Sequence, residues 1–545
     1  MPAPFHVPSP VAAALLTAAA IVSSPAAAVA QAIPADQPAP AVLCATPPEA
    51  VALGSAQWNG WGRGTENTRY QPEPAIRASD VSKLALKWAF GYPSGPVAGQ
   101  PTIVDGRVFV VSSAGRLYSL DAKSGCTYWS FDTQAGVLSA VSIAELGAPR
   151  TVAKPRRSRR GRTDAHLEVL KPPSAAFFGD DRGTVYAVDA QKGTLLWKTQ
   201  LETNAAARIE AAPAVFQDRL YVAVGSHEQA LAKDPAYACC SFRGSVAALD
   251  LASGRVIWKS YLVAEEPRPL AAAAGARQFG PAGIAVEGAP TLDAARGLVY
   301  VATGDSFNPA AQPLADALVA LGMSDGQVRW SKQLIAPAGV PSDFLASPIL
   351  RTLSTGKQAL LTAQRSGIVY SLDPDRAGEL LWQLGAAGAK YPGGSEWGPA
   401  ADHHSLYVAI SGTDALLPNA SGSLASIDIR TGAKRWQAEA PEPPCSWPSP
   451  PDCLHGNAQA VSLIPGAAFA GSMDGHLRAY STIDGKILWD YDTAKDFATV
   501  NRIKASGGSL DQGGATIVNG VVYVNSGSAP GKPGNVLLAF SVDGK

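Results

Sequence analysis

Two adjacent cysteines, Cys239 and Cys240, are the most distinctive chemical feature of this sequence. A disulfide between chain neighbours would close an eight-membered ring and force a strained peptide, an arrangement rarely kept for stability alone. The alternative is two ordinary cysteines, one or both of them buried. Glu228 stands upstream of the pair and Arg243 directly downstream, so acidic and basic groups flank it. This stretch is the first candidate for a functional site.

Four further cysteines bring the total to six, an even number that favours disulfides in an exported protein. The natural pairings are Cys239–Cys240, Cys445–Cys453 across a Pro-rich loop and, by elimination, Cys44–Cys126. No Cys-x-x-Cys-His motif occurs, so the sequence predicts no haem of the c type.

The N-terminal 30 residues are typical of a secretory signal. Val11–Val22 is apolar and Ala28-Val29-Ala30 is a cleavage motif, although the preceding segment contains His6 and no Lys or Arg. The sequence therefore predicts a periplasmic protein cleaved near Ala30, with a Pro/Ala-rich linker at residues 31–56. No stretch is long enough to span a bilayer, so we expect no stable membrane insertion.

A repeated unit must position these chemical groups. Gly244–Trp258 (GSVAALDLASGRVIW) is an apolar strand that reaches an Asp, turns at Gly254 and returns to a Trp. Variants of it begin at Gly115, Gly183, Ala317, Gly367, Gly422, Gly475 and Gly534, and the last one lacks its closing Trp strand. Such a recurring unit indicates a solenoid or a propeller.

Upstream of each copy lies a second strand pair, such as Pro101–Val111, with a hairpin turn signal at its centre. Two hairpins per repeat predict an all-β, eight-bladed propeller with four-stranded antiparallel blades at residues 57–545. Leu86–Phe90 would supply the missing eighth Trp strand and close the ring through the two chain ends. Each closing Trp is expected to pack between blades.

Longer spacing between the early Trp residues indicates inserted loops, which are common places for functional sites. One insertion, residues 145–173, contains the basic run Lys154–Arg162. It is either an anion-binding arm or, as we expect, a solvated and disordered loop.

At this level of detail the chain resembles the quinoprotein dehydrogenases, which are bacterial eight-bladed propellers that bind pyrroloquinoline quinone. It is most similar to the polyvinyl-alcohol dehydrogenase-like branch without a haem domain. The resemblance spans the mature chain and rests on Trp58–Pro72, Cys239–Asp250, Gly280–Asp293, Leu298–Asn308 and Gly393–Asp402.

The resemblance implies a quinone beside a Ca²⁺ ion on the ring axis, and an Asp that takes the proton from an alcohol. A Lewis acid polarises the quinone while hydride leaves the alcohol carbon, and Ca²⁺ prefers oxygen ligands. Glu228 and Asp305 match the metal-ligating positions, and Asp343 matches the catalytic base. The alternative for Glu228 and Asp305 is a structural role as turn-capping carboxylates.

The resemblance also implies a set of quinone contacts. The vicinal cysteines would stack on the quinone face, although in better-known family members that pair comes from a different repeat. A basic residue would contact the quinone oxygens, an Arg would pair with a quinone carboxylate, and a polar residue followed by Trp would lie at the axis. The matching residues here are Cys239, Cys240, Arg365, Arg243, Glu396 and Trp397.

Three positions depart from the family pattern. Glu287 replaces a Trp that stacks under the quinone, and Glu210 replaces a quinone-contacting Thr. Pro341 replaces the first Asp of the Asp-x-Asp run, so Asp343 alone remains. Extra carboxylates near an anionic quinone repel it unless a cation lies between them. Either the site is rebuilt or catalysis has been lost.

The sequence therefore predicts a periplasmic dehydrogenase that oxidises an alcohol, secondary or polymeric, and passes electrons to an external cytochrome c or another acceptor. The alternative is a non-catalytic propeller that acts as a binding or scaffold protein of the cell envelope. The formal net charge of zero gives no support for nucleic acid as a partner.

Overall fold

The computed structural model describes residues 43–54, 57–97, 99–148, 150–157, 163–170, 172–270, 278–307, 312–336, 342–386, 394–412, 422–441, 456–528 and 532–545. The predicted secretory signal, most of the predicted linker, Pro341, Cys445 and Cys453 lie outside these residues. Residues 43–54 run along blades 1 and 2, where Cys44 forms a disulfide with Cys126 and Val51 is buried.

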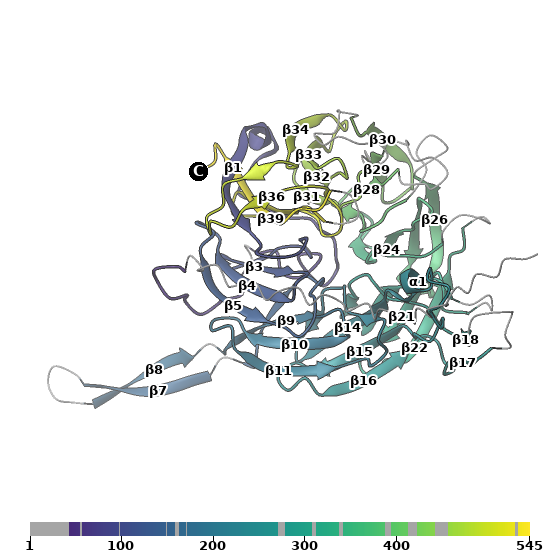
Figure 1. Cartoon of the computed structure of the whole chain (residues 1–545), viewed down its shortest axis with the longest axis horizontal. Coiled ribbons are helices and arrows are strands. Elements are labelled where there is room, and N and C mark those ends of the chain that lie inside the picture. The colour runs from purple at the N-terminus through teal and green to yellow at the C-terminus, as the bar shows by residue number, and fades with distance from the viewer. Residues whose placement is uncertain are drawn as a thin grey trace, which may run out of the picture. The chain divides into compact units, whose positions relative to one another are not determined.

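Eight antiparallel sheets of four strands follow one another along the chain and form the eight-bladed propeller that the repeat predicts. In blades 1 to 7 the strands follow the order of the sequence, from an inner strand near the axis to an outer strand (Figure 1). The first four blades are β2 (Thr102–Val104), β3 (Arg107–Ser112), β4 (Arg116–Asp121) and β5 (Thr127–Asp132); β6 (Ser142–Glu145), β9 (Ser174–Gly179), β10 (Thr184–Asp189) and β11 (Leu195–Gln200); β13 (Ala214–Phe216), β14 (Arg219–Ser226), β15 (Ser245–Asp250) and β16 (Val256–Tyr261); and β19 (Thr291–Asp293), β20 (Leu298–Ala302), β21 (Ala317–Gly322) and β22 (Val328–Gln333).

The remaining four blades complete the ring. They are β23 (Ile349–Thr352), β24 (Gln358–Ala363), β25 (Ile368–Asp373) and β26 (Glu379–Gly385); β27 (Ala400–Ala401), β28 (Ser405–Ile410), β29 (Ser423–Asp428) and β30 (Lys434–Glu439); β31 (Ser462–Ile464), β32 (Ala467–Gly471), β33 (His476–Ser481) and β34 (Ile487–Asp492); and β37 (Thr516–Val518), β38 (Val521–Ser526), β39 (Val536–Val542) and β1 (Leu84–Gly91). In blade 8, β1 pairs with β39, so the N-terminal strand replaces the missing Trp strand, as predicted.

Short elements decorate the blades. They are the 3₁₀ helices η1 (Ala78–Lys83) and η2 (Pro374–Arg376), the helix α1 (Glu228–Leu231), the strand β12 (Ala207–Arg208), and the two-stranded pairs β7 (Arg150–Arg157) with β8 (Thr163–Leu170), β17 (Arg268–Pro269) with β18 (Phe279–Gly280), and β35 (Asp496–Phe497) with β36 (Ala505–Ser506). Within the described residues no helix is long and apolar enough to cross a membrane.

The repeated Asp and Gly make the outer turn of each blade. In blade 3 the Asp250 carboxylate accepts a hydrogen bond from the backbone N–H of Ser253 at 2.9 Å, and Gly254 N–H donates to the Asp250 carbonyl at 2.8 Å. Gly254 has a φ of +71°, which favours glycine. A Cβ there would also lie 2.4 Å from Trp197 of the previous blade.

The closing Trp residues pack between blades, as predicted. Trp197 donates its indole N–H to Leu251 of the next blade at 3.1 Å, and Trp258 donates to Met323 at 3.1 Å. Trp88 on β1 donates to Ala122 of blade 1 at 3.2 Å, so the same contact seals the junction of blades 8 and 1. A large ring buried at each junction stabilises the array through area.

The basic insertion is not the disordered loop that we expected. Outside its tip, β7 and β8 pair from Arg150–Leu170 to Arg157–Thr163, and the ribbon projects beyond blade 2 (Figure 1). Each arm contains a short β-favouring stretch, Thr151–Val152 and Leu167–Val169, and backbone pairing of two such stretches satisfies their polar groups. The many charged residues of the insertion favoured a prediction of disorder over one of strands.

The segment Trp58–Gln71 crosses the axis and contacts the inner strands of most blades; we call it the axial plug. Its backbone bonds to Ile103 in blade 1, Leu292 in blade 4, Leu350 in blade 5, Ala401 in blade 6 and Leu463 in blade 7. Arg69 is fully buried in it, donates to Gln100 Oε1 at 2.7 Å and to Val461 O at 2.6 Å, and lies over Trp61. Burial lowers the pKa of Arg69 to about 9.

Candidate active site

A cavity of about 290 Å³ opens among the loops of blades 3 to 6. Its walls come from the ends of second strands and from the segments that lead into inner strands. They include Arg208, His227, Gln229, Lys233, Glu287, Asp305, Phe307, Asp343, Phe344, Arg365 and Glu396. Because equivalent loops of neighbouring blades meet at one end of a propeller axis, residues far apart in sequence converge here.

Three predicted residues form one ionic cluster in this cavity. Arg365 Nη1 donates to Asp343 Oδ2 at 3.0 Å, and Arg365 Nε lies 3.3 Å from Glu396 Oε2. Asp343 is 8% exposed. One guanidinium thus orients a buried carboxylate toward a polar cavity, which is a suitable arrangement for a proton acceptor.

Asp305, which the sequence predicts as a metal ligand, also lines the cavity. Its Oδ1 accepts a hydrogen bond from Gln229 Nε2 at 2.7 Å. Burial raises the pKa of Asp305, and the charge of Asp343 raises it further. Asp316 lies close behind, where burial and the charge of Asp305 raise its pKa to about 6. The cavity therefore has an excess of negative charge on this wall.

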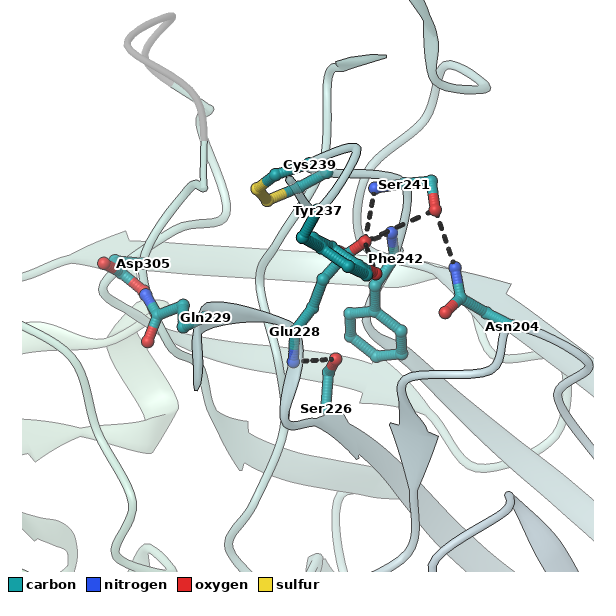
Figure 2. The surroundings of a disulfide bond; sticks show 10 residues. Asn204, Ser226, Glu228, Gln229, Tyr237, Cys239, Ser241, Phe242 and Asp305 are labelled. Atoms are coloured by element: carbon teal, nitrogen blue, oxygen red, sulfur yellow. Dashed lines mark hydrogen bonds between the residues drawn. A yellow bond between two sulfur atoms is a disulfide. The ribbon is translucent and has the colours of Figure 1, made fainter. Parts of the chain in front are cut away.

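Glu228 occupies a different position from that of Asp305 (Figure 2). Its Oε1 accepts from Tyr237 Oη at 3.0 Å and from Ser241 N at 2.8 Å, and its Oε2 accepts from Phe242 N at 2.9 Å. The side chain is fully buried and absent from the cavity wall. Its carboxylate holds the loop after α1 in place.

Cys239 and Cys240 form the vicinal disulfide in that same loop (Figure 2). The loop is fixed by Glu228 below and by mutual backbone bonds with Phe279, which donates to Cys239 O at 2.8 Å. Neither cysteine is among the residues that line the cavity; Gln229, Ala230 and Lys233 of the preceding segment do so. The structure therefore places the disulfide beside the cavity.

Arg243 and Trp397 point away from the cavity. The Arg243 guanidinium lies 3.9 Å from the centre of the Tyr261 ring and lines a separate hollow with Glu202 and Asn204. Trp397 donates its indole N–H to Asp511 Oδ1 at 2.6 Å. Burial raises the pKa of Asp511 to about 6.

Two acidic residues that the sequence had marked as departures, Glu287 and Glu210, form what we call the floor of the cavity, although only Glu287 is among the residues that line it. Glu210 lies next to Glu287, with its Oε2 3.2 Å from Arg208 Nε. Burial, and then the charge of Glu210, raise the pKa of Glu287 to about 8. Burial also raises the pKa of Glu210.

Three cationic or titratable residues were not predicted: Arg208, Lys233 and His227 as a wall residue. Arg208 stands two positions before Glu210. Opposite charges at alternate positions could have indicated that the two side chains pair on one side of the segment. Lys233 follows α1, a short helix that the strand repeat does not predict.

Comparison with known proteins identifies the family. Residues 58–387 match the family described as the β-propeller domain of glucose, ethanol and alcohol dehydrogenases. Residues 420–545 match the family described as outer membrane protein assembly factor BamB. A polyvinylalcohol dehydrogenase of a Pseudomonas species is 40% identical over 519 residues, which cover 90% of this chain and 77% of that protein. This chain belongs to the quinoprotein alcohol dehydrogenase family.

Further relatives agree with this assignment. A polyvinylalcohol dehydrogenase of Sphingopyxis sp. strain 113P3 is 38% identical across 93% of this chain and 80% of that protein. A quinohemoprotein alcohol dehydrogenase structure from Pseudomonas putida HK5 superposes with a TM-score of 0.66 at 17% identity, covering 90% of this chain and 81% of that one. The latter likeness supports the fold. The predicted resemblance is confirmed.

The cavity offers cations to pyrroloquinoline quinone, a flat tricarboxylate, but four acidic side chains, Glu287, Asp305, Asp343 and Glu396, line it as well. Arg208, Lys233 and Arg365 surround it, and cations of this kind recognise carboxylates. The predicted calcium ligands do not converge: Asp305 lines the cavity, whereas both oxygens of Glu228 accept backbone hydrogen bonds. Within the described part of the chain, no group of three or more His, Cys, Asp or Glu side chains forms a metal site.

Proposed function

We propose that this protein is a periplasmic dehydrogenase that oxidises secondary hydroxyls of a polymeric alcohol, with pyrroloquinoline quinone bound in the axial cavity. The ionic cluster of Asp343, Arg365 and Glu396 is the observation that carries the proposal. The substrate class is supported by the two polyvinylalcohol dehydrogenases at 38–40% identity. That similarity favours an enzyme over a non-catalytic scaffold.

The chain's own residues divide the work. Asp343 accepts the hydroxyl proton of the alcohol, and Arg365 orients the Asp343 carboxylate through the 3.0 Å bond. Lys233 would pair with a carboxylate of the cofactor, and Arg208, which already contacts Glu210, would add positive charge to that wall. Phe344 and Phe307 give the wall an apolar part. When bound, the quinone supplies the acceptor for the two electrons that leave the alcohol carbon.

Export and electron transfer are part of the same proposal. Two disulfides within the described residues suit an oxidising compartment such as the periplasm. A separate acceptor, a cytochrome c or another carrier, would receive the electrons. The role of Ca²⁺ stays a prediction, for which Asp305 is the better placed of the two predicted ligands.

Reconstitution tests the proposal. The purified protein is titrated with pyrroloquinoline quinone, with and without Ca²⁺, while quinone fluorescence reports binding and dye reduction reports oxidation of polyvinyl alcohol or 2,4-pentanediol. We expect tight binding and dye reduction, and we expect Arg365→Gln to weaken both. Arg329→Gln, which removes an exposed Arg from β22, is the matched control. Absence of quinone binding in the wild-type protein would overturn the proposal.

A further inference from the structure

The floor of the cavity is an unusual arrangement of charge. Glu210 and Glu287 come from the segments that lead into the inner strands of blades 3 and 4. A Cβ added to Gly225 would lie 3.0 Å from the Glu287 Cγ, so Glu287 packs closely on β14. Glu210 Oε2 and Arg208 Nε lie 3.2 Å apart, yet neither atom has an aligned hydrogen bond.

The charges on this floor do not balance. Arg208 is the cation beside the two carboxyls, and the other charges that act on Glu287 are Asp343 and Arg365. Arg365 is already engaged by Asp343 and Glu396. Two carboxylates that share one guanidinium in a buried site cannot both ionise near neutrality. The raised pKa values of Glu287 and Glu210 agree with this count of charges.

We propose that Glu210 and Glu287 hold one proton between them at neutral pH, and that Glu287, which lines the cavity, donates this O–H to the bound quinone. The second part rests on the proposed function, because it requires the quinone in this cavity. Here a hydrogen-bond donor takes the place that the family resemblance assigns to a flat Trp ring.

The shared proton has a thermodynamic consequence. The quinone is anionic, so it is compatible with a neutral acid below it and is repelled when both carboxyls are ionised. Its binding therefore requires the proton, and affinity falls as pH rises above the pKa of the floor pair. By linkage the dissociation constant rises by up to about tenfold for each pH unit in that range.

The quinone-free protein tests the first part. Infrared spectroscopy follows the carbonyl stretch of protonated carboxylic acids as the pH is raised. We expect a band at neutral pH that disappears as pH rises through about 8, and we expect it to be missing in Glu287→Gln. Glu379→Gln, which removes an exposed carboxylate from β26, should keep the band. A wild-type protein without it, or a Glu287→Gln variant that retains it, overturns the shared proton.

Quinone affinity tests the second part. The dissociation constant of pyrroloquinoline quinone is measured by fluorescence from about pH 6 to pH 9.5. We expect the steep rise in wild type and in Glu379→Gln, and a flat profile in Glu287→Gln, whose amide is a neutral donor at every pH. A flat wild-type profile, or an equal slope in Glu287→Gln, overturns the floor donor.

The two failures are distinguishable. If the wild-type protein binds no quinone at any pH, the proposed function fails while the infrared band still decides the protonation of the pair. If Glu287→Gln does not fold, Glu210→Gln serves instead. It removes the charge of Glu210 but not the burial of Glu287, so the pKa of Glu287 falls and the band should disappear at a lower pH than in the wild type. A band that disappears at the same pH overturns the shared proton.

Discussion

Two buried ionic clusters of this propeller differ in how their charges are matched. In blade 7 the fully buried Arg478 donates to Asp474 Oδ2 at 2.9 Å and to Asp490 Oδ2 at 3.1 Å. His476 Nδ1 lies 2.6 Å from Asp490 Oδ1. Each group here has a partner with aligned geometry. In the axial cavity, by contrast, Glu210 and Glu287 share one Arg.

The contrast separates a structural use of charge from a chemical one. A cluster with matched charges stabilises the packing of two strands and leaves no unpaired charge to bind a ligand. An unmatched cluster at the axis costs stability and leaves groups that can bind a cofactor or move a proton. We therefore expect charge removal to damage folding in blade 7 and function in the cavity.

The largest effect is expected for Asp343→Asn. Loss of the proton acceptor should lower kcat by about 10²–10⁴-fold, the usual contribution of general base catalysis. The melting temperature should stay near that of the wild type, because Asn keeps the shape of the side chain. Steady-state kinetics with reconstituted enzyme measures this. Unchanged kcat would assign the proton to another group.

Asp474→Ala should have the reverse profile. It leaves Arg478 fully buried with weakened compensation, and breaking a buried ion pair costs about 3–5 kcal/mol. Denaturant unfolding measures the loss of stability, and kcat per quinone-loaded site should be unchanged. A fall in kcat with normal stability would contradict the structural assignment of this cluster.

Glu287→Gln should change how stability depends on pH. Because burial raises the pKa of Glu287 to about 8, the folded state holds a proton that the unfolded state releases near pH 4.5. Its contribution to stability is full below that pH and is lost as pH rises toward 8. The slope is at most about 1.4 kcal/mol per pH unit. Unfolding curves should show this decline in wild type and not in the variant.

The smallest effect concerns His476 in the matched cluster. Burial lowers the pKa of His476, but the hydrogen bond to Asp490 and the charge of Asp474 outweigh it, so the net shift is upward. Its stabilisation is present below the unfolded pKa and is lost as pH rises through the folded pKa. We expect about 1 kcal/mol or less, measured as the difference between wild type and His476→Gln at low and high pH.

The fold was more predictable than the site because the repeat encodes local geometry. Asp250, Gly254 and Trp258 each act within one turn or across one blade junction, so their spacing carries the information. The positions of Glu228 and Arg243 depend on the path of an irregular loop. Backbone N–H groups of Ser241 and Phe242 donate hydrogen bonds to Glu228, and the Arg243 guanidinium packs on the Tyr261 ring. No periodic pattern in the sequence predicts either contact.

The predicted site residues that the structure brings into the cavity are those on blade positions. Arg365 follows β24, and Asp343 precedes β23, where the repeat fixes the direction of the chain. Glu287 and Glu210 were recognised as departures, but their shared Arg208 was visible only once blades 3 and 4 lay side by side.

The axial plug imposes an order on assembly. Trp58 pairs with Ile103, but Gln71 also donates to Ile517 of blade 8, and β1 needs β39 as its partner. The first strand of the chain can therefore pair only after the last one is available, and contacts of such long sequence separation form slowly. After seven blades have left the ribosome or translocase, the ring is still open because blade 8 is missing. The ring closes as a single late event, although every residue that lines the cavity belongs to blades 3 to 6.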